Sequence, residues 1–143
     1  MIAMDRAFVD TSVLVYFYDD TSPKKRDTAR ELVAGRGTTG TLVVSTQVLL
    51  ELYVILTRKR RPSMAPADAE DIVRTLAEWT VVPTDVSLVL AALERAREDT
   101  ISAWDALIIE AARVAGCRTL LTEDLQAGRD FDDLTVVNPF DRP

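Results

Sequence analysis

The sequence predicts an α/β protein in which helices flank a parallel β-sheet. Short apolar runs rich in β-branched residues alternate with longer stretches that carry helical signals, and this alternation is typical of βαβ units. The chain has 143 residues, of which 48% are hydrophobic and 28% are charged, which is the composition of one globular domain with a substantial core. We therefore expect residues 1–143 to form a single domain.

Each expected element has its own signal in the sequence. The five apolar runs that indicate strands cover residues 7–9, 41–45, 80–83, 119–122 and 134–137. Most of the helices between them begin at a hydroxyl residue that suits an N-cap, and these caps are Ser22, Ser45, Thr84 and Ser102. The expected helices cover residues 12–18, 23–34, 46–59, 68–77, 85–98 and 103–115.

Two features of the composition exclude several kinds of catalysis. The chain contains no histidine, which excludes Ser-His-Asp and Cys-His catalysis and histidine-ligated zinc. Its one cysteine, Cys117, can form neither an internal disulfide nor a cysteine zinc cluster. Catalysis would therefore fall to carboxylates, hydroxyls, lysines or a metal ion.

Nothing in the sequence indicates export or membrane insertion. The first residues lack the basic and apolar regions of a signal peptide, and no apolar run approaches the ~20 residues of a membrane span. A single cysteine does not require an oxidising compartment. We expect a cytoplasmic protein that has no membrane partner.

Asp10 and Glu51 are acidic residues in apolar surroundings. Asp10 directly follows the strand at residues 7–9, and ligands bind at the carboxyl ends of the strands in open parallel sheets. Asp10 could instead cap the helix at residues 12–18. Glu51 is the one charged residue within residues 48–56, so it must pair with a buried cation, bind a metal or shift its pKa.

Asp105 and Asp124 occupy similar positions later in the chain. Asp105 lies in the first turn of the last expected helix with isoleucine three and four residues ahead, although there it could simply complement the helix dipole. Asp124 follows the strand at residues 119–122 as Asp10 follows its own strand, although it could be a solvated loop residue. Its neighbour Glu123 is also acidic, so either of the two could be the relevant acid.

The predicted fold would bring these four acids to one rim of the sheet. The carboxyl ends of the two strands and the starts of the two helices would meet there. Four neighbouring carboxylates cannot all ionise unless a cation compensates them, and hard divalent ions such as Mg²⁺ or Mn²⁺ prefer oxygen ligands. Ligation of this kind is typical of phosphoryl-transfer sites, where the metal activates water.

Five segments together carry a resemblance to a known family. They are FVDTSVLVY (residues 8–16), QVLLELY (47–53), SAWDALI (102–108), LTEDLQ (121–126) and NPF (138–140). The chain resembles the PIN-domain ribonucleases in these segments, and most of all the VapC-type toxins of toxin–antitoxin pairs. The resemblance implies a PIN-like three-layer α/β fold with about five parallel strands, and the activity of a Mg²⁺-dependent endoribonuclease.

The same resemblance implies site residues and partners. The acidic quartet would be Asp10, Glu51, Asp105 and Asp124. Two of these, Asp10 and Asp105, would be the direct ligands of Mg²⁺ or Mn²⁺. The residues that would support the site by hydrogen bonding are Thr11, Ser12 and Thr122. Members of this type usually form homodimers and are silenced by a cognate VapB-type antitoxin.

Basic and aromatic residues offer possible contacts to RNA. The chain has a formal net charge of −6, so an RNA-binding surface needs localised cations or metals. We hypothesise that one cluster guides the RNA backbone, namely Arg58, Lys59, Arg60 and Arg61. These residues could instead complement the dipole at a helix C-terminus. Trp79 and Trp104 could stack bases, but the favoured interpretation places such aromatic residues in the core.

Two other functions are consistent with parts of the pattern. An aspartyl-phosphate phosphatase would use Asp10 as its nucleophile, but this class of enzyme also requires a second aspartate at the position where this chain has Ser12. A non-catalytic binding partner would keep the PIN fold for assembly alone. Metal-dependent cleavage of RNA that is lost in Asp10→Asn would distinguish the ribonuclease from both.

Overall fold

In the part of the chain that the structure describes, the sheet has six strands. The computed structural model describes residues 5–37, 41–60, 62–125 and 128–141, with the side chains of all of these except 36 and 37. The strands are β1 (Ala7–Val9), β2 (Leu42–Ser45), β3 (Thr80–Val82), β4 (Thr119–Leu121), β5 (Asp130–Phe131) and β6 (Leu134–Val137). Their spatial order is β3-β2-β1-β4-β6-β5, and every neighbouring pair is parallel except β5 with β6.

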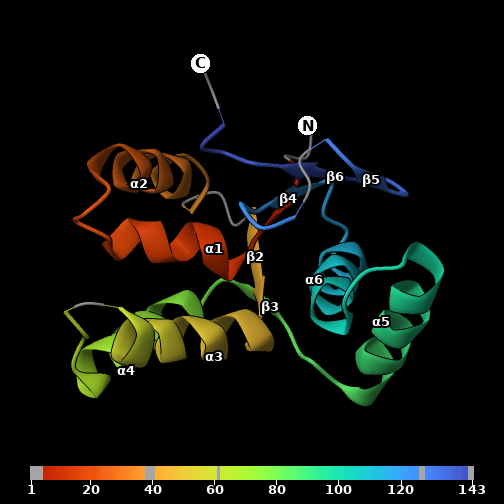
Figure 1. Cartoon of the computed structure of the whole chain (residues 1–143), viewed down its shortest axis with the longest axis horizontal. Coiled ribbons are helices and arrows are strands. Elements are labelled where there is room, and N and C mark those ends of the chain that lie inside the picture. Colours follow the sequence, from red (N-terminus) through yellow and green to blue (C-terminus); the bar gives the residue numbers. More distant parts are fainter. Residues whose placement is uncertain (1–4, 38–40, 61, 126–127, 142–143) are drawn as a thin grey trace.

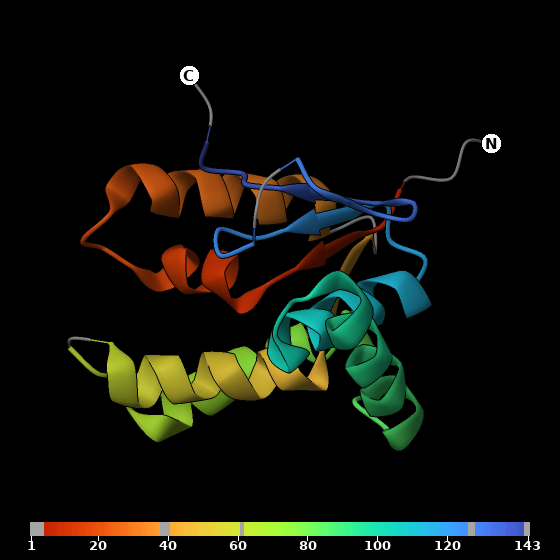
Figure 2. The same ribbon diagram turned by 45° about the vertical axis from the view of Figure 1, so that its right-hand side comes forward.

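Helices cover both faces of this sheet. They are α1 (Thr11–Leu14), α2 (Pro23–Gly37), α3 (Thr46–Val54), α4 (Pro66–Leu76), α5 (Val86–Asp99) and α6 (Ala103–Val114). A 3₁₀ turn, η1 (Val15–Tyr18), extends α1, and a π-helical turn, η2 (Ile55–Lys59), extends α3. Helices α1 to α4 lie on one side of the central strands and α5 and α6 on the other (Figure 1). The same separation is visible after a turn of 45° (Figure 2).

The α/β class and the parallel sheet are confirmed, and two local expectations are corrected. Strand β5 was not expected, because two residues are too few to show a periodic pattern; it pairs with β6 across a turn in which Asp132 has a φ of 59°. The N-cap of α5 is Asp85 rather than Thr84, since the Asp85 side chain accepts a hydrogen bond from the Leu88 backbone N–H at 2.9 Å.

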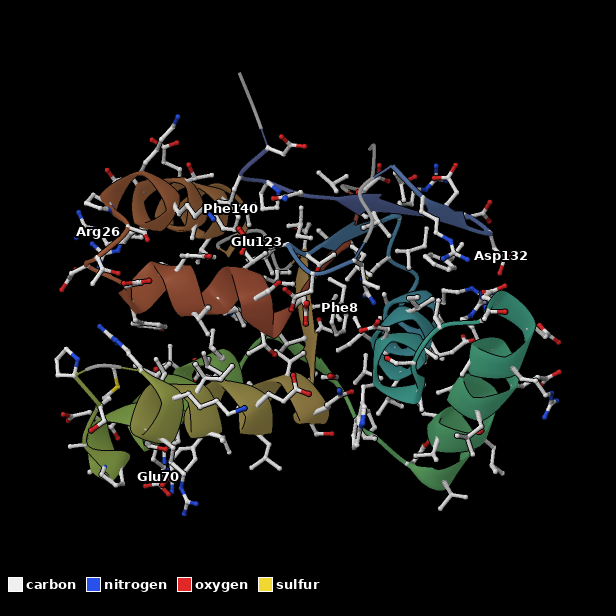
Figure 3. The ribbon with its side chains drawn as sticks, in the orientation of Figure 1. Phe8, Arg26, Glu70, Glu123, Asp132 and Phe140 are labelled. Atoms are coloured by element: carbon white, nitrogen blue, oxygen red, sulfur yellow. The ribbon has the colours of Figure 1, made fainter. Side chains whose placement is uncertain are left out.

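Apolar side chains of the central strands form the middle of the core. All residues of β1 and all apolar residues of β2 are buried, as expected for parallel strands that helices cover on both faces. Phe8 lies at the centre of the molecule, between the two helical layers (Figure 3).

In the described ranges, no helix is both long and apolar enough to cross a bilayer.

The direction in which the chain crosses the sheet reverses between β1 and β4. From β1 the chain moves outward to β2 and β3 with α1 to α4 on one face, and then it crosses back to β4 with α5 and α6 on the other face. In open α/β sheets ligands bind at the carboxyl ends of the strands beside such a reversal. Val9 pairs with Leu121 in the sheet, so residues 10 and 122 leave the two strands side by side.

Candidate active site

Asp10 lies at the point where the chain reverses across the sheet. Its carboxylate is buried and accepts hydrogen bonds from the Thr11 backbone N–H at 2.8 Å, the Ser12 hydroxyl at 3.1 Å and the Thr122 hydroxyl at 2.8 Å. Burial raises the pKa of Asp10 above its usual value, and these hydrogen bonds offset only part of that effect. Asp10 is also the N-cap of α1. The capping interpretation is therefore correct, and it does not exclude Asp10 from the acidic cluster.

Glu51 is held by hydrogen bonds rather than by a cation. The Thr11 hydroxyl donates to Glu51 Oε2 at 3.0 Å, and the Gln47 amide donates to Glu51 Oε1 at 2.9 Å. Among the described residues no ion pair involves Glu51, so pairing with a buried Lys or Arg is wrong for this structure. Gln47 was not expected at the site, although its position one helical turn before Glu51 was visible in the sequence.

Asp105 and Asp124 complete a group of four carboxylates that act on one another electrostatically. The pKa of Asp124 is raised, first by partial burial and then by the negative charges of Glu123, Asp105 and Glu51, in that order. The charge of Asp124 in turn contributes to the raised pKa of Asp10. The four predicted acids therefore meet at one rim, each from a different segment: the end of β1, α3, the first turn of α6 and the segment after β4.

Glu123 faces a different set of partners from Asp124. Its carboxylate accepts hydrogen bonds from Lys25 Nζ at 2.6 Å and from the Tyr16 hydroxyl at 2.8 Å. Lys25 also lies over the rings of Tyr16 and Phe140, at 4.7 and 5.6 Å from their centroids. Glu123 and Phe140 lie near each other beside α2 (Figure 3). Lys25 thus compensates Glu123, whereas no described cation pairs with Asp124.

The hydroxyls that the sequence places beside the acids link the elements of the site. Thr122 donates to Asp10 and accepts from the Asp124 backbone N–H at 3.1 Å. Ser12 donates to Asp10 and accepts from the Glu123 backbone N–H at 3.0 Å. Through these hydrogen bonds, both hydroxyls connect Asp10, at the end of β1, with the backbone of the segment after β4.

The basic cluster begins in the last two residues of the π-helical turn η2, which extends α3, and continues past its end. Arg58 and Lys59 are exposed and Arg60 is half-buried, while Arg61 lies outside the described residues. Trp104 is 70% exposed, so its expected place in the core is wrong, because residues 102–104 at the start of α6 are exposed and the buried run of that helix begins at Ala106. Trp79 is half-buried against the core as expected.

The chemistry of the four carboxylates fits a hard divalent cation. The described part of the chain holds no group of three or more acidic, histidine or cysteine side chains already arranged around an ion position. The donors are nevertheless all oxygens, their charges raise the pKa of Asp124, and no described cation compensates them. An ion bound here would remove that repulsion and draw the carboxylates together.

Comparisons with known structures agree with this fold. A VapC toxin from Mycobacterium tuberculosis, described as cleaving the sarcin–ricin loop, has a TM-score of 0.64 and 26% identity over 80% of this chain and 86% of that chain. A toxin–antitoxin complex from Klebsiella pneumoniae has a TM-score of 0.70 and 15% identity over 93% of this chain and 97% of that chain. DNA-bound VapBC from Salmonella typhimurium has a TM-score of 0.64 and 19% identity over the same shares.

The comparison with protein families covers nearly the whole chain. No curated protein matches the sequence significantly. The sequence model of the PIN domain matches residues 7–133, which contain all four carboxylates and the strands that position Asp10 and Asp124. Because this match extends over far more than half of the chain, the protein belongs to the PIN domain family.

Proposed function

We propose that this protein is a divalent-metal-dependent endoribonuclease and the toxin of a toxin–antitoxin pair. The observation that carries the proposal is the meeting of four carboxylates, uncompensated by any described cation, at the sheet reversal of a PIN-domain fold. PIN-domain nucleases generally depend on a divalent metal, and carboxylate oxygens suit Mg²⁺ or Mn²⁺. The similarity to a VapC toxin that cleaves RNA supports RNA as the substrate.

Each side chain of the site has a role in this proposal. Asp10 and Asp105 would hold the ion, and Glu51 and Asp124 would hold water or a second ion. When bound, the ion would lower the pKa of a water molecule and stabilise the leaving oxygen of the phosphodiester.

The hydroxyl and amide donors would orient the carboxylates. Hydrogen bonds to a carboxylate fix its rotamer. Ser12 and Thr122 do this for Asp10, while Thr11 does so for Glu51 together with Gln47. These contacts hold the acceptor oxygens in defined positions, which would preorganise them for the reaction.

The similar structures also support the partners that we propose for this protein. Two of the similar structures are toxin–antitoxin complexes, and this supports a cognate VapB-type antitoxin for this chain. We also expect a homodimer, with RNA as the substrate and the cytoplasm as its location. The exposed Arg58 and Lys59, with Arg60 and Arg61, would guide the RNA backbone.

Cleavage of RNA in the presence of defined metals tests the activity. The wild-type protein should cut RNA with Mg²⁺ or Mn²⁺ and stop in EDTA, and Asp10→Asn or Asp105→Asn should remove the cutting. Asp71→Asn is the control, because Asp71 is exposed on α4, outside the acidic group. Equal cutting by a folded Asp10→Asn protein would refute the mechanism, and hydrolysis of phosphate monoesters instead of RNA would favour the phosphatase.

The basic cluster has a separate test. Replacing Arg58, Lys59, Arg60 and Arg61 together with alanine should weaken RNA binding and reduce the salt dependence of the affinity. An unchanged affinity with an unchanged salt slope would remove these residues from the RNA surface.

A further inference from the structure

A pocket next to the carboxylates contains Trp104 and Leu50, which have no role in the function proposed so far. It lies between α3 and the start of α6 and has a volume of about 540 Å³. This volume is within the usual range for small-ligand sites. Its lining is mostly apolar and includes Gln47, Leu50, Glu51, Ile55, Lys59 and Trp104. We call it the Trp104 pocket.

Trp104 is an unusual residue to leave exposed. Its side chain is 70% exposed, and Leu50 on the opposite side of the pocket is 66% exposed. Among the described residues Trp104 has no stacked ring, cation over its ring or hydrogen bond. Large exposed aromatic surface of this kind usually marks a binding site.

The pocket is continuous with the acidic group. Glu51 belongs to both, and Trp104 directly precedes Asp105. A molecule held in the pocket therefore lies beside the position where a phosphodiester would have to sit to be cut.

The polar atoms of the pocket suit one particular ligand. Gln47 donates its amide hydrogen to Glu51, but its buried Oε1 has no hydrogen-bond partner in the described part of the chain. A buried acceptor without a partner carries a free-energy cost, which a rotation of the Gln47 amide toward a donor on a ligand in the pocket would relieve. Lys59 adds an exposed cation to the same lining. A flat aromatic ligand that carries hydrogen-bond donors on its edge and an adjoining phosphate would be complementary to Trp104, Gln47 and Lys59.

We propose that the Trp104 pocket receives one unpaired nucleobase of the RNA substrate, stacked on the Trp104 indole, with an adjoining phosphate toward Lys59. This inference rests on the proposed ribonuclease activity and adds to it a subsite for one base beside the phosphodiester that is cut. Proteins that recognise single-stranded RNA stack unpaired bases on aromatic side chains and hydrogen-bond to the base edges. The base would hold the chain so that its neighbouring phosphodiester reaches the carboxylates.

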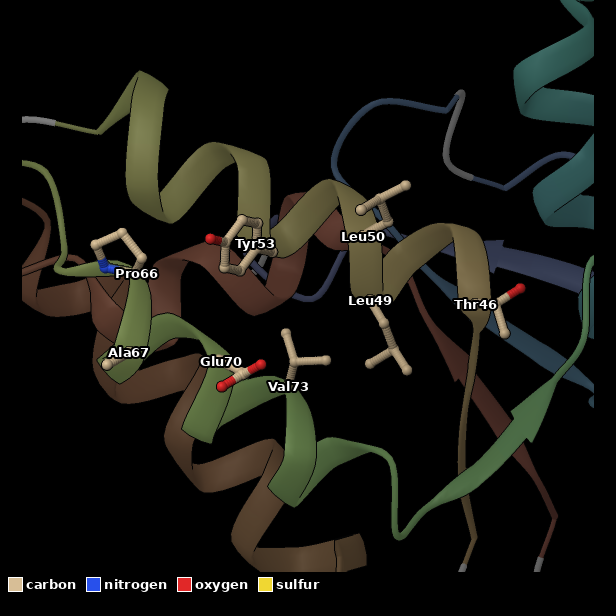
Figure 4. Close-up of a pocket in the computed structure, with 8 residues that line it drawn as sticks. All are labelled: Thr46, Leu49, Leu50, Tyr53, Pro66, Ala67, Glu70 and Val73. Atoms are coloured by element: carbon tan, nitrogen blue, oxygen red, sulfur yellow. The ribbon is translucent and has the colours of Figure 1, made fainter.

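A second apolar groove lies on the other side of Leu50 and differs in chemistry. It runs between α3 and α4, has a volume of about 510 Å³ and contains Tyr53, Val73 and Glu70 (Figure 4). None of the four carboxylates lines it, and its charged side chain is acidic, which disfavours a phosphate. The Trp104 pocket alone of these two combines aromatic surface with a cation and a place beside Glu51.

Binding of single-stranded RNA in EDTA tests the pocket without cleavage. We expect Trp104→Ala to weaken binding by about 5- to 150-fold, the usual loss for one stacked base. Trp104→Phe should retain much of the affinity because phenylalanine still stacks. Val86→Ala is the matched control, since Val86 is an exposed apolar residue on α5 that does not line the pocket. RNA should also quench tryptophan emission in the wild type but not in Trp104→Phe, where Trp79 is the remaining tryptophan.

An RNA of abasic nucleotides separates base stacking from backbone binding. The abasic strand should bind the wild type and Trp104→Ala equally, because it lacks the group that the pocket holds. If the wild type cuts RNA while Trp104→Ala binds RNA as tightly as Val86→Ala, the pocket proposal fails and the ribonuclease stands. If the wild type neither cuts nor binds RNA, the ribonuclease fails and the pocket proposal with it. A Trp104→Ala protein with unchanged RNA affinity but a smaller mass in solution would mark a contact between protein chains instead.

Discussion

Asp10 carries a charge that its own surroundings disfavour. The carboxylate is buried, and its pKa is raised despite three hydrogen bonds. Such a group destabilises the folded protein at any pH at which it is ionised. Catalytic positions often conflict with stability in this way, because the residue is retained for its chemistry rather than for packing.

We expect Asp10→Asn to abolish cleavage while stabilising the metal-free protein at neutral pH. Asparagine also serves as an N-cap for α1, and it removes the buried charge. Because the folded-state pKa is raised, the penalty exists above that pKa and disappears as the pH falls through it toward the unfolded value. The stability difference between variant and wild type should therefore shrink on acidification. Urea denaturation in EDTA over a pH series measures it, and a variant less stable than wild type at neutral pH would contradict the prediction.

The Thr122 hydroxyl contacts two groups of the site, the Asp10 carboxylate and the Asp124 backbone N–H. We expect Thr122→Val, which keeps the shape but loses the hydroxyl, to lower metal-dependent cleavage by about 10- to 100-fold. The loss follows because Asp10 loses a donor and the Asp124 backbone N–H loses its acceptor. Thr122→Ser is the control and should restore most of the activity. Equal activity of the valine and serine variants would show that the hydroxyl has no part in the reaction.

At the scale of elements, Lys25 ties α2 to the segment that carries Asp124. Its ammonium bonds to Glu123, and the hydrogen bond to Glu123 is the main cause of its raised pKa. This salt bridge places a positive charge next to Glu123, whereas Asp124, its neighbour in the sequence, pairs with no described cation. We therefore expect Lys25 to position Asp124 indirectly.

Lys25→Met should lower kcat by about 10-fold and leave KM for RNA nearly unchanged. Backbone hydrogen exchange at Glu123 and Asp124 should quicken, because their segment loses its link to α2. Lys24→Met is the matched control, since Lys24 is exposed and its side chain has no partner among the described residues. A lower melting temperature with kcat and exchange unchanged would mean that Lys25 serves stability alone.

Arg95 joins α5, α6 and the β5–β6 turn on the side of the molecule away from α1 to α4. It pairs with Glu110 at 2.8 Å, Asp99 at 2.7 Å and Asp132 at 3.0 Å. Arg95 and Glu110 are nearly buried, with side chains 13% and 10% exposed. Removing one member of such a network leaves the others desolvated without their full set of partners.

We expect Arg95→Met to lower the free energy of unfolding by about 1–3 kcal/mol. Arg113 still contacts Glu110, which limits the loss. Arg74→Met is the control, because its 3.7 Å pair with Glu70 is exposed, and it should change stability by less than about 1 kcal/mol. Chemical denaturation measures both, and equal effects would contradict the importance of the Arg95 network.

At the scale of the whole molecule, four acids from separate elements come together at one edge of the sheet. The reversal between β1 and β4 directs Asp10 and Asp124 to that edge, while α3 and α6 bring Glu51 and Asp105 from opposite faces. No single element holds two of these four acids. An ion bound between them would therefore link both helical layers through the sheet, and its binding energy would add to the stability of the fold.

Mn²⁺ should raise the melting temperature of the wild-type protein in a concentration-dependent manner. A ligand at 100 times its Kd stabilises by about 2.7 kcal/mol. Asp105→Asn should reduce the shift, because it removes a proposed ligand, whereas the exposed Asp71→Asn should retain it. Differential scanning fluorimetry measures the shift without RNA. An equal shift in Asp105→Asn and wild type would remove Asp105 from the ion site.

The sequence by itself determined the class of fold and pointed to four acids as candidates for the site. Alternating apolar and helical segments specify βαβ units, and such units place strand ends and helix starts at one edge, so the convergence of Asp10, Glu51, Asp105 and Asp124 was predictable. The short strand β5 was not predictable, because its two residues are ordered by pairing with β6.

Only the tertiary structure decided which partners surround each acid. Glu123 and Asp124 are indistinguishable as sequence neighbours, and they differ because Lys25, 98 residues from Glu123 in the chain, reaches one and not the other. The exposure of Trp104 was likewise undetermined, since an aromatic residue in the first turn of an apolar helix is buried or exposed according to how that helix docks. Local pattern specifies elements, whereas long-range contacts decide the environment of each side chain and therefore its chemistry.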